Sequence, residues 1–106
     1  MWRKDGDAEA YLYVNKDIQD KAISSIPPKT EINPIFGISA GRGAFKFNSG
    51  QWDTIGLYIK LNDIGNANGI FKIWFNKKLA IQFDKMVWRS MDMAIDGIQF
   101  ETFFGE

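Results

Sequence analysis

The residues of this chain that could do chemistry begin with a short run near its start, EAYLYV, at positions 9–14. Apolar and polar side chains alternate strictly along this run, which predicts an extended strand. The expected core side of the strand carries Ala10, Leu12 and Val14. The other side carries a row, about 7 Å from one residue to the next, of Glu9, Tyr11 and Tyr13. Such a row is typical either of packing between neighbouring strands or of the floor of a sugar-binding groove.

Two residue types, cysteine and histidine, are missing from the 106 residues. Disulfides, thiol nucleophiles, Ser-His-Asp catalysis and zinc bound by Cys or His are therefore excluded within this chain. Any proton transfer has to use Tyr, Lys, Asp or Glu.

A glycine-flanked cation, Gly41-Arg42-Gly43, is a second candidate. Glycines allow a close backbone approach, so Arg42 could stand beside an anionic ligand. The alternative is a glycine-assisted bend before a strand. The run is not a dinucleotide-binding fingerprint, because the remaining glycine and the following helix are absent.

A group of oxygen-bearing side chains could offer ligands to calcium: Asn62, Asp63, Asn66 and Asn68. The group lacks the acidic density of a calcium loop, and turns use the same residue types. The sequence therefore favours a turn, and predicts neither a metal ion nor a cofactor.

Two further sets of residues have alternative interpretations. Glu9 and Glu101 are both expected on strands and could form a glycosidase pair if their strands were neighbours. Four tryptophans, of which we expect at least two in the core, could stack on sugar rings: Trp2, Trp52, Trp74 and Trp88.

Charge and composition exclude some classes of protein. The formal net charge is zero, which argues against nucleic-acid binding by phosphate neutralisation. No apolar run is long enough to cross a bilayer, so we expect no membrane partner. The first six residues, MWRKDG, have no apolar segment of the kind found in a signal peptide.

The pattern along the chain indicates an all-β protein. A long surface loop is predicted for residues 15–34, with a short helix near 17–22. Strands after the first are predicted at residues 44–47, 52–61, 70–75, 79–83 and 95–104, with a tight reversal at 76–78. Residues 84–92 read as irregular, with Trp88 directed inward. Short strands separated by turn residues predict an antiparallel β-sandwich or jelly roll, in one domain over residues 1–106. About six strands are few for such a fold, which indicates an incomplete one.

Several stretches, taken together and in order, resemble polysaccharide lyase family 14. The opening MWRKDGDAEAYLYV is similar to the strand that carries the family's Tyr-x-Tyr pair. Further similar stretches are FGISAGRGAFKF (36–47), GQW (50–52), KLNDIGNANG (60–69) and QFETFFG (99–105). The resemblance covers nearly the whole chain and is weakest over residues 15–34.

The resemblance implies a secreted β-jelly roll that cleaves an acidic polysaccharide, alginate or glucuronan, by β-elimination. Tyr11 and Tyr13 match the family's tyrosine pair and take the catalytic positions. Free tyrosine has a pKa of about 10, so nearby cations must stabilise a phenolate. In the family, the two tyrosines are accompanied by a Ser-x-Arg motif and a Lys, whose positions fall before Met1. Arg3 and Lys4 follow that motif and do not replace it.

The sequence thus predicts a lyase-like chain that is inactive or weakly active, with Tyr11 and Tyr13 as catalytic residues and Glu9 and Arg42 as substrate-binding residues. The alternative is a non-catalytic carbohydrate-binding or structural β module. An incomplete jelly roll leaves strand edges unpaired, so we also expect self-association or pairing with a companion chain.

Overall fold

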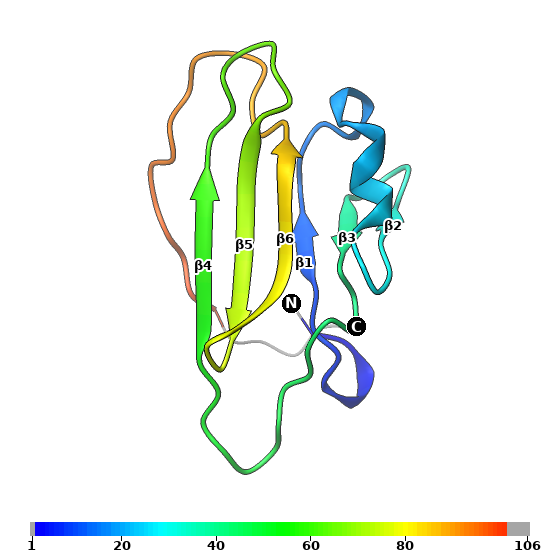
Figure 1. Ribbon diagram of the computed structural model, residues 1–106, viewed down its shortest axis with the longest axis vertical. Helices are drawn as coiled ribbons and strands as arrows, with labels where there is room; N and C mark the ends of the chain where they lie inside the picture. Colours follow the sequence, from blue (N-terminus) through cyan, green and yellow to red (C-terminus); the bar gives the residue numbers. More distant parts are fainter. Residues whose placement is uncertain (1, 102–106) are drawn as a thin grey trace.

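The computed structural model describes residues 2–101, which form two three-stranded antiparallel sheets (Figure 1). The first sheet has the order β1-β3-β2, with bounds Ala10–Leu12, Ile38–Ala40 and Glu31–Ile32. The second sheet has the order β4-β5-β6, with bounds Ile55–Lys60, Gly69–Phe75 and Lys78–Met86. The predicted all-β, antiparallel class is confirmed.

Three short 3-10 helices, with no α-helix in residues 2–101, complete the regular structure: η1 (Lys4–Gly6), η2 (Lys16–Ile18) and η3 (Lys21–Ser25). The side chain of Asn15 caps η2 and that of Asp20 caps η3, each by accepting a backbone N–H. The predicted surface loop over residues 15–34 is wrong in one respect. Ile23 and Ile26 are buried, so this segment closes one side of the core instead of lying over the surface.

The core joins the two sheets in one apolar cluster. Leu12 and Ile38 enter it from the first sheet, and Phe71 and Ile81 from the second, with Ile23 packed against them. Alternation therefore predicted the buried side of β1 correctly: Ala10 and Leu12 are each 8% exposed, while Val14 packs at the margin.

The hairpin between β5 and β6 forms as predicted. Asn76 and Lys77 both have positive φ, 50° and 69°, the conformation that a two-residue hairpin turn requires and that Asn tolerates well. Asn76 also ties the turn to the start of β4. Its side chain accepts the backbone N–H of Thr54, and its own N–H donates to the Thr54 carbonyl.

Two predicted strands are wrong. Residues 44–47 contain only an isolated bridge from Lys46 to Asp7, and the strand lies earlier, at Ile38–Ala40. Gly41 and Gly43 end β3, because both adopt positive φ and turn the chain. Residues 95–101 form no strand, and the rest of that prediction, 102–104, lies outside the described residues.

The outer strand β4 alternates as predicted, but its apolar side chains are not covered. Ile55, Leu57 and Ile59 are 45%, 63% and 38% exposed. Within residues 2–101, β4 pairs only with β5, and no second sheet covers this part of the apolar face. The second sheet is therefore wider than the layer packed on it.

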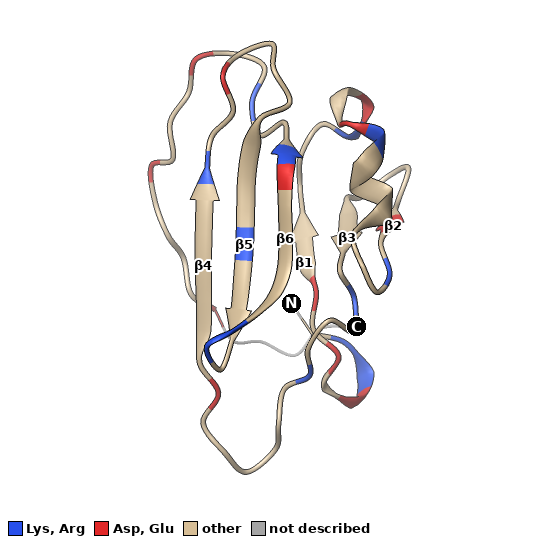
Figure 2. Cartoon of the chain, viewed as in Figure 1, with Lys and Arg blue, Asp and Glu red and all other residues tan. Residues whose placement is uncertain are grey.

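Charged residues gather at strand ends and in connections, while the centres of β4 to β6 carry few (Figure 2). No helix among the described residues has the length and apolar character to span a membrane.

Candidate functional site

Tyr11 of β1 and Tyr13, which directly follows this strand, lie together on its polar face. Tyr11 pairs directly with Ser39 of β3, so phenol and hydroxyl belong to the same face of the sheet. The rings of Tyr11 and Tyr13 meet edge to face, with centroids 5.3 Å apart and planes at 65°. Tyr13 is 80% exposed and Tyr11 is half-buried, so the pair is open to a ligand.

Gly37, just before β3, supports the ring of Tyr11. A Cβ at this position would lie 3.1 Å from Cε1 of Tyr11 and 2.6 Å from the carbonyl oxygen of Leu12. The tyrosine ring therefore lies close over the glycine backbone, where no side chain fits.

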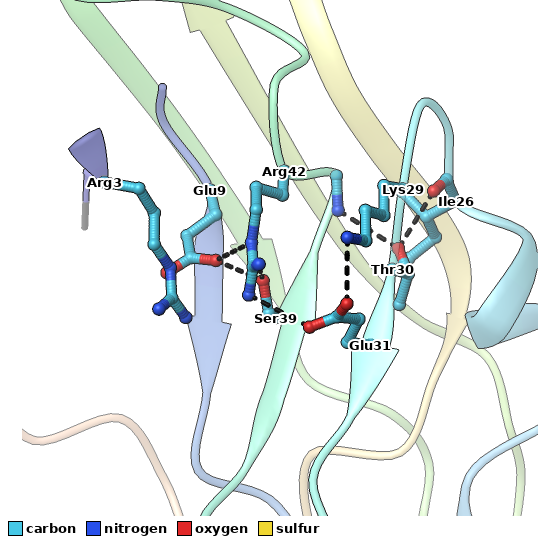
Figure 3. A network of polar contacts seen from close by, with 9 residues as sticks. Arg3, Glu9, Ile26, Lys29, Thr30, Glu31, Ser39 and Arg42 are labelled. Atoms are coloured by element: carbon cyan, nitrogen blue, oxygen red, sulfur yellow. Dashed lines mark hydrogen bonds and ion pairs between the residues drawn. The ribbon is translucent and has the colours of Figure 1, made fainter. Parts of the chain in front are cut away.

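Glu9 is the centre of a polar network on the same face (Figure 3). Its side chain is fully buried, and Oε1 accepts from Nε of Arg3 at 2.9 Å. Oε2 accepts from Nε of Arg42 at 3.2 Å and from the hydroxyl of Ser39. Burying a carboxylate costs its hydration, and surrounding cations and hydrogen-bond donors must offset that cost. Arg3, Arg42 and Ser39 do so for Glu9.

Arg42 also reaches a second carboxylate. Its terminal nitrogen lies 3.2 Å from Oε2 of Glu31, whose Oε1 is 2.9 Å from Nζ of Lys29. The hydrogen bond and charge of Lys29, followed by the charge of Arg42, hold the pKa of Glu31 below its ordinary value of 4.5. The network thus runs from Arg3 to Lys29 across all three strands of the first sheet.

The glycines on either side of Arg42 form a bend that holds this cation in place. Gly41 has φ of 67°, and a Cβ there would meet the side chain of Ile81 at 2.7 Å. The backbone N–H of Arg42 donates to the carbonyl of Lys29 at 2.8 Å. The same glycine bend therefore turns the chain after β3 and holds Arg42 in position. The interpretation as a bend and the interpretation as a positioned cation are compatible.

A groove of about 520 Å³ follows β1 on the side away from β3. Its lining includes Tyr11 and Tyr13 on one side and apolar residues of β4 and β5, among them Leu57 and Phe71, on the other. The tyrosine pair therefore stands where the polar face of the first sheet meets the uncovered apolar face of the second.

Other candidates lie away from this face or have structural roles. Glu101 is exposed near the end of the described residues, whereas Glu9 is buried among cations. Asn62 is fully buried: its Oδ1 accepts the backbone N–H groups of Trp88 and Arg89, and its Nδ2 donates to the Arg89 carbonyl. It braces the chain after β6, so the turn interpretation of its loop accounts for this residue. Residues 2–101 contain no cluster of three or more His, Cys, Asp or Glu able to hold a metal ion.

The expectation that at least two tryptophans are core residues is wrong. Trp52 is 99% and Trp2 54% exposed, and Trp74 and Trp88 are only partly buried. Trp88 lies at the margin of the core, edge-on to Phe71 with centroids 5.9 Å apart.

Sequence reasoning missed Arg3 and Ser39 as parts of this network. Ser39 could have been found from its position as a polar residue between Ile38 and Ala40. Alternation puts such a residue on the polar face of a strand. The position of Arg3 depends on a turn, which an isolated bridge between Trp2 and Ala8 closes.

Comparisons with known proteins bear on the family and the fold of the chain. A search of curated proteins finds no match to the chain. Among solved structures, the chain is similar to the marine PL-14 alginate lyase from Aplysia kurodai, with 26% sequence identity and a TM-score of 0.72. The match covers 85% of this chain and 35% of that one, so the chain spans about a third of the length of the solved enzyme.

The family comparison covers more of the chain. The family model described as polysaccharide lyase 14 matches residues 1–106. The resemblance noted from the sequence is thereby confirmed, and the two antiparallel sheets match part of the fold of a solved member. The chain belongs to the polysaccharide lyase 14 family.

Proposed function

We propose that the polar face of β1 binds a uronic-acid polysaccharide, alginate or glucuronan, and takes part in its cleavage by β-elimination. One observation carries the proposal. Tyr11 and Tyr13 are in edge contact, Tyr13 is exposed and Tyr11 half-buried, and the anchored cation Arg42 lies on the same sheet face. This combination suits a polymer with hydroxyls and one carboxylate on every sugar.

The reaction makes three demands on the protein. It must neutralise the uronate carboxylate, remove the proton at C5 and protonate O4 as the C4–O4 bond breaks. Tyr11 and Tyr13 serve as the proton-transfer and substrate-contact residues, a task that tyrosine can perform when a cation stabilises the phenolate. Arg42 contacts the substrate through the guanidinium nitrogens that its two carboxylate partners leave available.

Glu9, predicted as a substrate-binding residue, contributes through its neighbours in this proposal. Its side chain is fully buried, and each of its oxygens holds a guanidinium. A sugar therefore meets Arg3 or Arg42 before it meets the carboxylate. Glu9 is a positioning residue that fixes the two cations relative to Tyr11.

In this 106-residue chain we expect cleavage to be weak or absent. Glu9 and Glu31 already balance the charge of Arg42, so this cation stabilises a phenolate only weakly. The test is to incubate the protein with alginate and, separately, with glucuronan, and to follow the ultraviolet absorbance of the unsaturated product. Product formation that is lost in Tyr11→Phe and Tyr13→Phe supports catalysis by this pair. Product formation unchanged in both variants contradicts it.

A second function, glycan binding without cleavage, has its own support. Arg42 is held by Glu9, Ser39 and Glu31 at once, and its side chain is 23% exposed. A cation balanced by two carboxylates stabilises a phenolate less than an unpaired one does, but it still holds a ligand. Under this alternative, wild-type protein binds alginate with no product, and a Tyr11→Ala, Tyr13→Ala double variant loses binding. Unchanged binding by the double variant counts against it.

We also propose that the chain self-associates or pairs with a companion chain. Two features support this. Within residues 2–101 no strand element pairs with β1 on the side away from β3, and the apolar side chains of β4 are uncovered. Open strand edges and apolar faces drive association.

A further inference from the structure

A second cavity, of about 710 Å³ and open to solvent, lies beside η1, near the start of the chain. Its lining includes one cation, one carboxylate, two aromatic rings, an amide and a hydroxyl, from Arg3, Asp5, Trp2, Phe47, Asn48 and Ser49. The two sides come from distant parts of the sequence, the turn before β1 and the loop before β4. This mixture of groups suits an acidic sugar, which presents a carboxylate, several hydroxyls and an apolar ring face.

Arg3 connects this cavity to the tyrosines. Its Nε donates to Oε1 of Glu9. Glu9 also lines the groove that contains Tyr11 and Tyr13. The guanidinium has five N–H donors, and its hydrogen bond to Glu9 uses only Nε. The side chain is 37% exposed, so part of it is accessible to a ligand. Figure 3 shows its terminal nitrogens directed away from Glu9.

The walls of the cavity are held in place before any ligand binds. Gly6 and Phe47 are linked by a backbone hydrogen bond of 2.9 Å, and a Cβ on Gly6 would lie 2.7 Å from the Phe47 carbonyl oxygen. The ring of Trp2 meets that of Phe47 edge to face, with centroids 5.7 Å apart. Asp53 fixes Asn48 by accepting its backbone N–H at 2.8 Å. Little ordering entropy therefore remains to be lost on binding.

Each group has a chemical task that fits a uronate. Arg3 can pair with the sugar carboxylate through two parallel N–H donors. Trp2 is 54% exposed and offers an apolar surface to a ring face. Asp5, Asn48 and Ser49 can exchange hydrogen bonds with hydroxyls. The Asp5 carboxylate also repels a second negative charge, which favours one carboxylate per sugar.

We infer that this cavity is an additional acidic-sugar subsite, which binds a sugar of the same polymer whose neighbouring part contacts Tyr11 and Tyr13. Arg3 and Trp2 are its binding residues, and Glu9 positions Arg3. The inference rests on the proposed function, because it assumes a uronate polymer on the tyrosine face. It adds a specific consequence, that affinity increases with oligomer length once the ligand reaches Arg3.

The test is calorimetric titration of the full chain with purified alginate oligomers of two, four and six sugars, each for wild type, Arg3→Ala and Trp2→Ala. We expect the wild type to bind the longest oligomer more tightly than the shortest. Arg3→Ala should weaken binding of the longest oligomer roughly tenfold, as expected for loss of a charge-assisted contact. Trp2→Ala should weaken it by about fivefold through lost apolar contact. Trp2→Ala, at a residue outside the tyrosine groove, should not affect the shortest oligomer.

Matched controls separate a subsite from general charge or surface effects. Lys4→Ala removes the same charge from the same turn, and Trp52→Ala removes a fully exposed ring outside the cavity lining. Both should bind like wild type. Arg3→Lys restores part of the affinity if the contact is a charge contact, and Trp2→Ala tests the cavity if Arg3→Ala fails to fold.

The outcomes are distinguishable. If all variants bind the oligomers as tightly as wild type, or if wild-type affinity does not depend on oligomer length, the subsite is overturned. The proposal for the tyrosine face is then unaffected. An equal loss in Lys4→Ala and Arg3→Ala also overturns it, since only general charge would then matter. If wild type binds no oligomer, the proposed function fails and the subsite fails with it.

Discussion

Glu9 and Arg42 form an ion pair across the first sheet, with Nε 3.2 Å from Oε2, although 33 residues separate them in the sequence. The pair joins the start of β1 to the bend after β3. Because the carboxylate is buried, the pair ties the stability of the first sheet to the position of a cation on its open face.

Replacing Glu9 tests this link. Glu9→Gln preserves the shape of the side chain but leaves Arg3 and Arg42 without their shared buried counter-charge. We expect the free energy of unfolding to fall by about 3 kcal/mol, as for other broken buried pairs. Urea titration followed by circular dichroism measures it. Glu31→Gln, at a carboxylate that is 52% exposed, is the control and should have a much smaller effect. An equal loss in the free energy of unfolding in both variants would show that the burial of Glu9 adds nothing to stability.

Gly37 tests the support of the tyrosine ring. In Gly37→Ala the new Cβ would lie 2.6 Å from the Leu12 carbonyl oxygen and 3.1 Å from the Tyr11 ring, so strand and ring must both shift. We expect a loss of about 2 kcal/mol in stability, typical of forced overpacking, and weaker oligouronate binding. Gly97→Ala is the control, because nothing lies within 4 Å of its Cβ and its φ is not positive. Binding unchanged in a folded Gly37→Ala protein would mean that the position of Tyr11 does not matter.

Asp53 makes stability sensitive to acid. Hydrogen bonds from the backbone of Asn48, then from the side chains of Gln51 and Asn76, hold the pKa of Asp53 well below its ordinary value of 3.8. A carboxyl whose pKa is lower in the folded state stabilises the fold above its unfolded pKa. That contribution declines as the pH falls below about 4, toward the folded pKa.

The measurement is thermal unfolding from pH 6 to pH 2.5 in wild type and Asp53→Asn. We expect wild type to lose stability over the lower part of this range more steeply than the variant. Glu31, whose pKa is also lowered, contributes in the same direction in both proteins, so the difference between them isolates Asp53. Parallel curves would exclude Asp53 as a source of acid sensitivity.

Leu57 tests the uncovered face of β4. Its side chain is 63% exposed at the centre of the strand, among apolar neighbours. If this face mediates association, Leu57→Lys should lower the sedimentation-derived mass toward the monomer while the melting temperature changes little. Ile98→Lys is the control, since Ile98 is 100% exposed outside any strand. A wild-type protein that is monomeric over a wide concentration range would contradict the proposal.

The sequence by itself determined the features that arise from local patterns. Strict alternation identified the two sides of β1, and with them the shared polar face of Tyr11 and Tyr13, because successive strand residues point to opposite faces. A tight reversal within residues 76–78 was readable from the strand patterns on either side of it, and the structure places the turn at Asn76 and Lys77. The family resemblance also needed nothing more than the order and spacing of short motifs.

Only the tertiary structure decided which distant residues meet. Alternation put Glu9 on the polar face, where exposure would be expected. The chain instead folds Arg3, Ser39 and Arg42 around it, and their combined charge and hydrogen bonds offset the cost of burial. Likewise, β4 has the apolar pattern of a covered strand, yet Leu57 is exposed, because burial depends on which elements pack opposite and not on the strand's own pattern.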